Sequence, residues 1–276
     1  KGTPPLSDIR EGSRSLARAV LGGMLNTREL LDIAGVLRAA RQLKSWSPED
    51  PGSLAGLFAA LIPNKFLEEK ITLSILGEDE IADAASSELA SIRRHMRAAN
   101  AKIRGVLNKI ITSPSYSKVL QEPIITMRAD RYVIPVKAEH KGSLSGLVHD
   151  VSSSGQTLFI EPMQVVQANN EIRELQAKEK KEIERILMEL SNDAAGFESD
   201  ILCDQRVLIR LDLIFARAKL SYRMKGDEPQ ISEDGRVALR RARHPLLDPK
   251  KAVPIDIAVG GEFDTLVITG PNTGGK

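Results

Sequence analysis

The last seven residues of the chain carry the spacing of a phosphate-binding loop. They fill the pattern Gly-x-x-x-x-Gly-Lys as Gly270, Pro271, Asn272, Thr273, Gly274, Gly275 and Lys276. Glycines permit positive φ and let backbone N–H groups approach phosphate oxygens, and the lysine adds a cation for the terminal phosphates. The apolar run 265–269 ahead of them is expected to be the strand that delivers the loop. These residues predict binding of ATP phosphates, and the alternative is a glycine-rich turn with an incidental lysine.

The same loop lacks the groups that hydrolysis requires. The Ser or Thr that holds Mg²⁺ would follow Lys276, and the acidic metal-holding strand and the catalytic base would lie further on. We therefore expect an incomplete nucleotide site: no catalytic residue in this chain, most Mg²⁺ ligands beyond it, and no rapid ATP hydrolysis by residues 1–276 alone.

Composition narrows the class of protein. The chain has 276 residues, 42% hydrophobic and only 4% aromatic, which suits long helices better than a β-sandwich. The net charge is +2, so nucleic-acid affinity would have to come from local patches. The single Cys203 excludes an internal disulfide, fits a reducing compartment and is expected to be a buried apolar residue. No apolar run reaches membrane-spanning length and no signal peptide is visible, so we expect a cytoplasmic protein without membrane contact.

Apolar spacing predicts that residues 1–112 are helical. The longest pattern runs from Ile81 to Ile110 with apolar residues every three or four positions, and Thr112-Ser113-Pro114 ends it. A helix of that length is expected to be a lever or arm. Residues 45–53, with two prolines, are expected to form a loop.

The pattern changes after residue 122. Two hairpins are expected within 124–136 and 147–160, followed by helices over 163–190 and 197–222 that should pack as an antiparallel, coiled-coil-like pair. Residues 226–235 are expected to be a linker, and short strands follow. The expected fold is mostly α: a long-helix core and lever and a coiled-coil-like arm with a small β insert, then the start of a P-loop α/β ATPase domain.

Positive charge is concentrated in one stretch. No Asp or Glu lies between Leu89 and Gln121, while seven cations do: Arg93, Arg94, Arg97, Lys102, Arg104, Lys109 and Lys118. Several recur at helical spacing, so one face could follow a phosphate backbone. A solvated helix face balanced by the acidic stretch 171–189 remains the alternative. A rival patch near the hairpins consists of Arg128, Arg131, Lys137 and Lys141.

A catalytic relay is the less favoured interpretation of His149-Asp150 and the serines 152–154. These residues are neighbours on one strand and turn, and alternate strand residues face opposite ways. A structural role, in which Asp and Ser close a turn, is expected instead. His140 and His149 lack metal-ligand spacing, so no metal site is expected in this chain.

Several stretches resemble the type-2 MutS proteins. The loop 269–276, with Pro-Asn after its first glycine, looks like the MutS phosphate loop, and Arg243-His244-Pro245-Leu246-Leu247 resembles the opening of the MutS ATPase domain. The type-2 branch is indicated by four middle segments: 131–137 (RYVIPVK), 146–150 (GLVHD), 153–162 (SSGQTLFIEP) and 169–172 (NNEI).

The resemblance implies an architecture of four parts. They are a helical core and lever over 1–120, a small β region near the clamp over 121–165, long antiparallel helices over 166–225 and a truncated ATPase domain over 226–276. No mismatch-reading Phe-x-Glu wedge is present, which argues for recognition of DNA shape.

The resemblance also implies function and partners. Such proteins are homodimeric ATPases that bind branched DNA, suppress homologous recombination and, in some bacteria, act on collided ribosomes and their RNA. Their nuclease domain would lie beyond Lys276. A nucleoid- or ribosome-associated location follows, and residues 1–276 alone are expected to be a monomer or weak dimer. A chromosome-organising coiled-coil ATPase is disfavoured, because there the phosphate loop precedes the coil. A non-catalytic scaffold for nucleic acid or ribosome is the remaining alternative.

Overall fold

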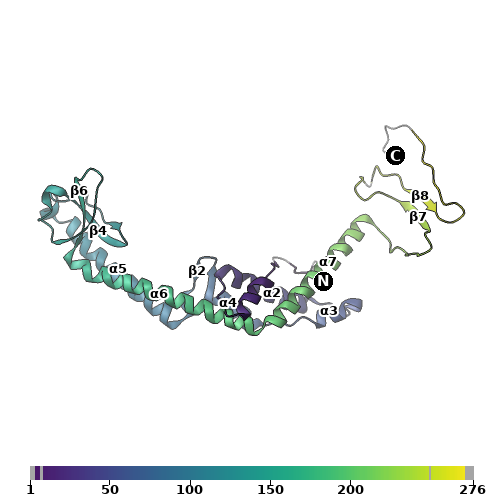
Figure 1. The fold of residues 1–276 in the computed structure, drawn as a ribbon, viewed down its shortest axis with the longest axis horizontal. Coiled ribbons are helices and arrows are strands. Elements are labelled where there is room, and N and C mark those ends of the chain that lie inside the picture. The colour runs from purple at the N-terminus through teal and green to yellow at the C-terminus, as the bar shows by residue number, and fades with distance from the viewer. Residues whose placement is uncertain (1–3, 7–8, 249, 271–276) are drawn as a thin grey trace. The chain divides into compact units, whose positions relative to one another are not determined.

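The computed structural model describes residues 4–6, 9–248 and 250–270, and the chain separates into two units, 1–209 and 210–276. The first is mostly helical and carries the buried cores, and it also contains a four-stranded antiparallel sheet (Figure 1).

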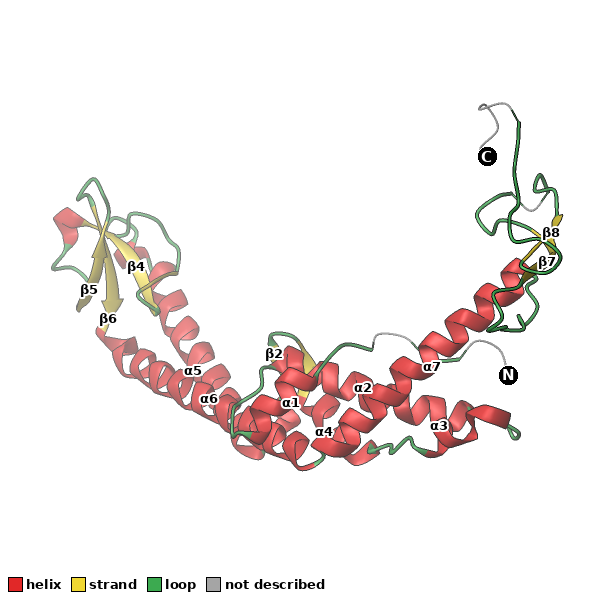
Figure 2. Ribbon diagram, turned by 45° about the vertical axis from the view of Figure 1, so that its right-hand side comes forward, coloured by secondary structure: helices red, strands yellow, loops and turns green. Residues whose placement is uncertain are grey.

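Helices dominate the first unit (Figure 2). The α-helices are α1 (Ser13–Val20), α2 (Thr27–Trp46), α3 (Ala55–Ala59), α4 (Lys65–Ser74), α5 (Ser87–Ile111), α6 (Met163–Gly196) and α7 (Glu198–Met224), whose second half belongs to the other unit. Short 3₁₀ turns occur at η1 (Gly52–Leu54), η2 (Asp83–Ala85), η3 (Pro114–Tyr116) and η4 (Ala138–His140). Side-chain caps fix some helix starts: Asn26 and Glu29 form a capping box on α2, and Ser86 accepts from the Leu89 N–H of α5.

The strands form three antiparallel sheets. A small hairpin joins β1 (Ile75–Gly77) to β2 (Glu80–Ile81). The main sheet has the order β3-β4-β6-β5, built from β3 (Thr126–Arg128), β4 (Arg131–Lys137), β5 (Gly146–Val151) and β6 (Thr157–Pro162). In the second unit β7 (Val237–Ala242) pairs with β8 (Ile255–Val259). Both expected hairpins within 124–160 are therefore confirmed, and they join through the β4–β6 pairing.

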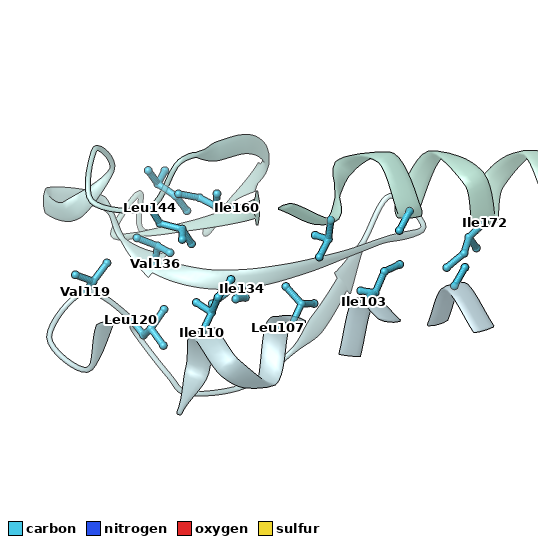
Figure 3. Close-up of a cluster of buried hydrophobic side chains, with 14 residues drawn as sticks. Ile103, Leu107, Ile110, Val119, Leu120, Ile134, Val136, Leu144, Ile160 and Ile172 are labelled. Atoms are coloured by element: carbon cyan, nitrogen blue, oxygen red, sulfur yellow. The ribbon is translucent and has the colours of Figure 1, made fainter. Parts of the chain in front are cut away.

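One continuous core connects the long helices to the main sheet. Helices α5 and α6 lie side by side, and the sheet follows at their far end (Figure 1). Ile103 and Leu107 of α5 are fully buried with Ile134 and Val136 of β4, and Ile172 of α6 belongs to the same cluster (Figure 3). Because helix and sheet residues share this cluster, the sheet and the end of the α5–α6 pair pack as one body.

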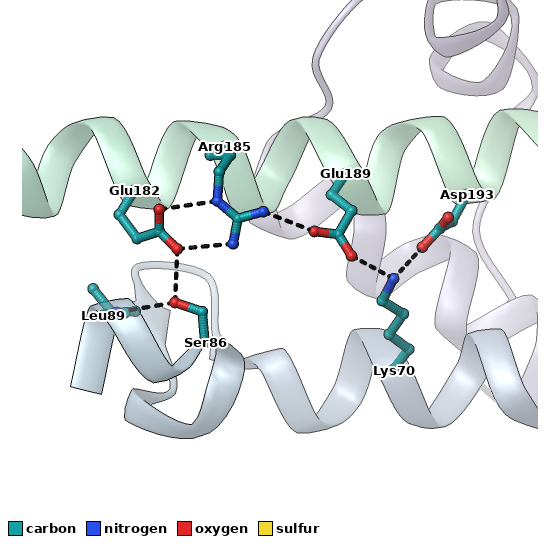
Figure 4. A network of polar contacts seen from close by, with 7 residues as sticks. All are labelled: Lys70, Ser86, Leu89, Glu182, Arg185, Glu189 and Asp193. Atoms are coloured by element: carbon teal, nitrogen blue, oxygen red, sulfur yellow. Dashed lines mark hydrogen bonds and ion pairs between the residues drawn. The ribbon is translucent and has the colours of Figure 1, made fainter. Parts of the chain in front are cut away.

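A second core and a polar network hold the near end of α6. Leu16 of α1, Leu30 and Leu37 of α2 and Ile71 of α4 are almost completely buried there. Beside this core the ammonium of Lys70 donates hydrogen bonds to Glu189 and Asp193 of α6 (Figure 4). Arg185 donates to both Glu189 and Glu182. Glu182 also accepts a hydrogen bond from the Ser86 hydroxyl. The network thus ties α6 to α4 and to the first turn of α5.

The expected mostly helical fold is confirmed, but three details differ. The lever helix begins at Ser87 rather than Ile81, because Ile81 belongs to β2 and Ser86 caps the helix. The expected antiparallel pairing of 163–190 with 197–222 is wrong: α6 packs along α5 instead. A single residue, Phe197, separates α6 from α7, and the loops that reverse a helical hairpin have two to about five residues.

The third difference lies in the second unit. The sequence predicts a strand over 265–269, but these residues have no regular secondary structure, and Val267 and Ile268 are largely exposed. A strand requires hydrogen-bonded neighbours, and no described segment pairs with this run.

Candidate nucleic-acid interface

Acidic neighbours neutralise part of the expected basic strip on α5. Arg93 donates to Glu179 at 2.6 Å and to Asp83 at 2.8 Å, and its side chain is only 22% exposed. Burial alone would lower the pKa of Arg93, but the hydrogen bonds to Asp83 and Glu179 outweigh this effect, so the pKa is raised. Arg97 pairs with the same Asp83 at 3.2 Å. The described geometry therefore gives Arg93 a structural role between α5, η2 and α6.

The other cations of the strip are exposed. Arg94, Lys102, Arg104 and Lys109 on α5, and Lys118 beyond it, form no hydrogen bond or ion pair through their side chains within the described ranges. At 3.6 residues per turn, Ala98, Ala101 and Gly105 fall in line with Arg94 on the exposed face. Lys102 and Lys109 flank this line on one side and Arg104 on the other. Small residues between cations let a polyanion approach the helix closely.

Much of the rival patch on the main sheet is also paired. The guanidinium of Arg128 lies 4.2 Å from the centre of the Phe159 ring and contacts Asp150 at 3.2 Å. Arg131 is bound to Glu161 at 2.9 Å. Lys137 and Lys141 keep their ammonium groups free of any partner in the described part of the chain.

A buried carboxylate organises this end of the sheet. Glu161 at the end of β6 has no exposed surface and accepts two bonds from Arg131 of β4, at 2.9 and 3.0 Å. Asn169 of α6 donates to it at 2.8 Å, and His149 of β5 contacts it through Nε2. Asn169 also bonds the backbone of Tyr132. The Glu161 cluster, consisting of Glu161, Arg131, His149 and Asn169, therefore joins three strands to one helix.

The four middle segments noted in the sequence meet at this cluster. Arg131, His149, Glu161 and Asn169 come from 131–137, 146–150, 153–162 and 169–172 respectively. Glu161 is not among the site residues expected from the sequence. Its position directly after the apolar run Leu158-Phe159-Ile160 indicates a buried carboxylate, which requires a cationic or hydrogen-bonding partner. Buried charges are retained only with such compensation.

The structure gives His149, Asp150 and Ser152 structural contacts, but only Ser152 closes the turn as expected, because Asp150 lies within β5. His149 is held by Glu161, while the Asp150 carboxylate contacts Arg128 and the Val151 N–H. The Ser152 hydroxyl accepts from Thr157 N at 3.0 Å, which closes the β5–β6 turn. Cys203 is half-buried, with its thiol directed at the Ala60 carbonyl, so the expectation of full burial is not met.

The predicted nucleotide loop falls mostly outside the described residues. Gly270 is exposed and non-helical, and Pro271, Asn272, Thr273, Gly274, Gly275 and Lys276 lie beyond the described ranges. In the described part the preceding run 265–269 forms no strand. Within the same part, no group of three or more His, Cys, Asp or Glu side chains could hold a metal ion. None of the helices described combines the length and apolarity needed to cross a bilayer.

Comparison with known proteins gives a consistent result. No family model matches the chain. Curated relatives named "Endonuclease MutS2" are similar over its whole length: it is 50% identical to the protein of Ruminiclostridium cellulolyticum, 49% to that of Acetivibrio thermocellus and 46% to that of Alkaliphilus metalliredigens. In each case all of this chain is covered but only 36% of the relative, so the chain spans about a third of their length. Because the identity is 46–50% in alignments that cover the whole chain, the chain belongs to the type-2 MutS family.

Proposed function

We propose that this chain is the nucleic-acid-binding arm of an ATP-dependent MutS2-type protein that binds branched or structured DNA and suppresses homologous recombination. The observation that carries the proposal is the exposed, unpaired set Arg94, Lys102, Arg104 and Lys109 on one long helix without acidic residues among them. Free cations at this spacing gain energy by releasing counterions from a phosphate backbone, whereas the charge of Arg93 is already compensated by Asp83 and Glu179.

ATP is the proposed cofactor, with Gly270 to Lys276 holding its phosphates. The support is the loop sequence and the family, and bound ATP would supply the energy of a conformational cycle. We extend the proposal to Mg²⁺, the cation that P-loop proteins bind together with the nucleotide. The relatives' name includes an endonuclease, so we extend nuclease activity to this protein as a proposal, and assign it to none of the residues 1–276. Homodimerisation is a separate proposal, which rests on the resemblance to the family and not on the relatives' name.

A non-catalytic scaffold that binds nucleic acid or a ribosome is the competing proposal. The same free cations favour it, because rRNA presents the same phosphate backbone as DNA. The two proposals differ in their dependence on ATP and in their preference among nucleic acids.

The test is fluorescence anisotropy with a labelled four-way DNA junction, a linear duplex of equal length and a structured RNA, over a salt series with and without ATP. The variant carries Lys102→Ala, Arg104→Ala and Lys109→Ala. A matched triple variant on α6 changes Lys178, Lys180 and Lys181 to Ala, which are exposed and form no ion pair with any described residue.

The expected result is a preference for the junction, with a salt slope that becomes shallower by about 0.9 for each lost phosphate contact in the α5 variant. The α6 variant should retain the parent slope. A preference for RNA that ignores ATP would favour the scaffold, and an unchanged slope in the α5 variant would reject the α5 strip as the interface.

A further inference from the structure

A shallow polar cavity lies at the end of the main sheet opposite the Glu161 cluster. Its volume is about 380 Å³, and its lining includes Gln121, Lys137, Glu139, Ser154 and Gln156. None of these residues belongs to the α5 strip or to the Glu161 cluster. They come from the segment after η3, the end of β4 with η4, and the β5–β6 turn.

Backbone hydrogen bonds hold these three segments side by side. Lys137 N donates to Val119 O at 3.0 Å, and Gln121 N donates to Pro135 O at 3.0 Å, so residues 119–121 run along β4. On the other side Ala138 N donates to Gln156 O at 2.9 Å. Val119 and Val136, which neighbour these segments in the sequence, are buried in the core cluster shown in Figure 3.

The β5–β6 turn is closed in a way that leaves donors free. Gly155 N donates to Ser152 O at 2.8 Å, and Gly155 adopts φ +74°, a conformation that favours glycine. A Cβ at Gly155 would meet no atom within 4 Å, so backbone conformation alone calls for glycine there. The N–H groups of Ser153, Ser154 and Gln156 donate to no acceptor in the described part of the chain. Successive free N–H groups in such turns form anion-binding concavities.

The side chains around the cavity are also available. The ammonium of Lys137 and the amides of Gln121 and Gln156 make no hydrogen bond to any described residue. Glu139 is the acidic member of the lining, and its carboxylate lies 3.7 Å from His140 Nε2. Near the lining residues in sequence, Lys118 and Lys141 are exposed and so is Glu122, so together with Lys137 and Glu139 they make three cations and two carboxylates.

We propose that this cavity is a second contact site, for a phosphodiester group of the nucleic-acid strand. An ammonium, primary amides, serine hydroxyls and free backbone N–H groups are the donors that proteins use for nucleic-acid phosphates. The shallow shape of the cavity suits a continuous backbone rather than an enclosed small molecule. The inference rests on the proposed function, and it adds an anchor beyond α5, at the end of the sheet.

The experiment uses the same labelled junction, duplex and RNA with single variants of residues 1–276. Lys137→Ala and Gln156→Ala test the cavity, Lys137→Arg keeps the charge, and Lys180→Ala on α6 is the matched loss of one exposed cation. Thermal unfolding of each variant checks that the fold is intact, as expected for side chains without described partners.

The expected result is that Lys137→Ala weakens binding about 3- to 10-fold at moderate salt and makes the salt slope shallower by about 1, with little dependence on sequence. Gln156→Ala should weaken binding with an unchanged slope, because it removes no charge, and Lys137→Arg should restore the slope. Loss on RNA alone would assign the site to RNA rather than DNA.

The outcomes separate the two proposals. If the parent chain binds and Lys137→Ala behaves like Lys180→Ala, the cavity is not a phosphate site while the α5 proposal stands. If the α5 variant loses binding and the cavity variants do not, the same conclusion follows. If the parent chain binds none of the three nucleic acids, both proposals fail together.

Discussion

A single buried carboxylate, Glu161, holds three strands and a helix together at the end of the arm. Replacement by Gln keeps its shape but removes the charge that compensates Arg131, which is only 14% exposed. Because breaking a buried pair leaves an uncompensated charge, Glu161→Gln should lower the free energy of unfolding by about 3 kcal/mol, measured by urea denaturation. Asp150→Asn is the control: Arg128 and Asp150 are 40% and 49% exposed, so the loss should stay below about 1 kcal/mol. Equal small losses would contradict the assigned role.

Asp204 on α7 makes the stability of the fold depend on pH. Burial raises the pKa of this carboxyl, although Ile62 N donates to Oδ1 at 2.7 Å; Oδ2 has no partner among the described residues. With the pKa raised in the folded state, its stabilising contribution is complete below the unfolded value near 3.8 and is lost as pH rises through the folded pKa.

Asp204→Asn should therefore raise stability near pH 7, by about 1 kcal/mol, and have less effect near pH 4, because a neutral amide costs less to bury than a carboxylate. Thermal unfolding at the two pH values measures this difference. A loss of stability at pH 7 would show that the Asp204 charge is compensated by a group such as Lys44, whose charge opposes the rise in the pKa.

At the scale of elements, two glycines should respond oppositely to Ala. Gly105 lies inside α5, where a Cβ would meet no atom within 4 Å, so Gly105→Ala should stabilise the helix by about 1 kcal/mol. At Gly146 in β5 the same atom would lie 2.2 Å from Glu161 O and 2.6 Å from Ile160 Cγ2. Gly146→Ala should then cost at least about 1–3 kcal/mol. Circular dichroism during thermal unfolding measures both, and the same sign for both would refute the packing argument.

The sequence predicts the elements better than their partners. Apolar residues every three or four positions identify α5 and α6 because that period defines one helix face. The same period does not identify the helix that covers this face. The sequence-based expectation takes α7, the helix that follows α6, as its partner, whereas α5 packs there. The apolar pattern also places the start of α5 too early, although Ser86 and Glu88 carry an N-terminal signal. At the candidate interface the sequence locates the cations, but only geometry separates the paired Arg93 from the free Lys102.

At the scale of the whole molecule, the two units differ in how much they bury. Within the described residues the buried apolar side chains end at Leu211, and Val237, Leu239 and Ile255 of the β7–β8 hairpin are about half exposed. In the second unit the sequence indicates a nucleotide-binding domain through the motif Gly270 to Lys276, which can be recognised from seven consecutive residues. A strand over 265–269 depends on neighbours distant in sequence, which is why the motif can be recognised while its lead-in strand is not formed.

This difference predicts how the chain tolerates shortening. Residues 225–276 add no buried apolar side chain among those described, so a chain ending at Met224 should unfold at the same temperature, within about 0.5 kcal/mol of stability. A chain ending at Gly196 also loses the buried Ile201 and Leu208, and the Asp204 bond to Ile62, so it should be destabilised by several kcal/mol, at about 2–5 for each large buried side chain removed. Differential scanning calorimetry compares the three chains. A large drop on removing 225–276 would show that these residues stabilise the first unit, and the cores described above would then account for only part of its stability.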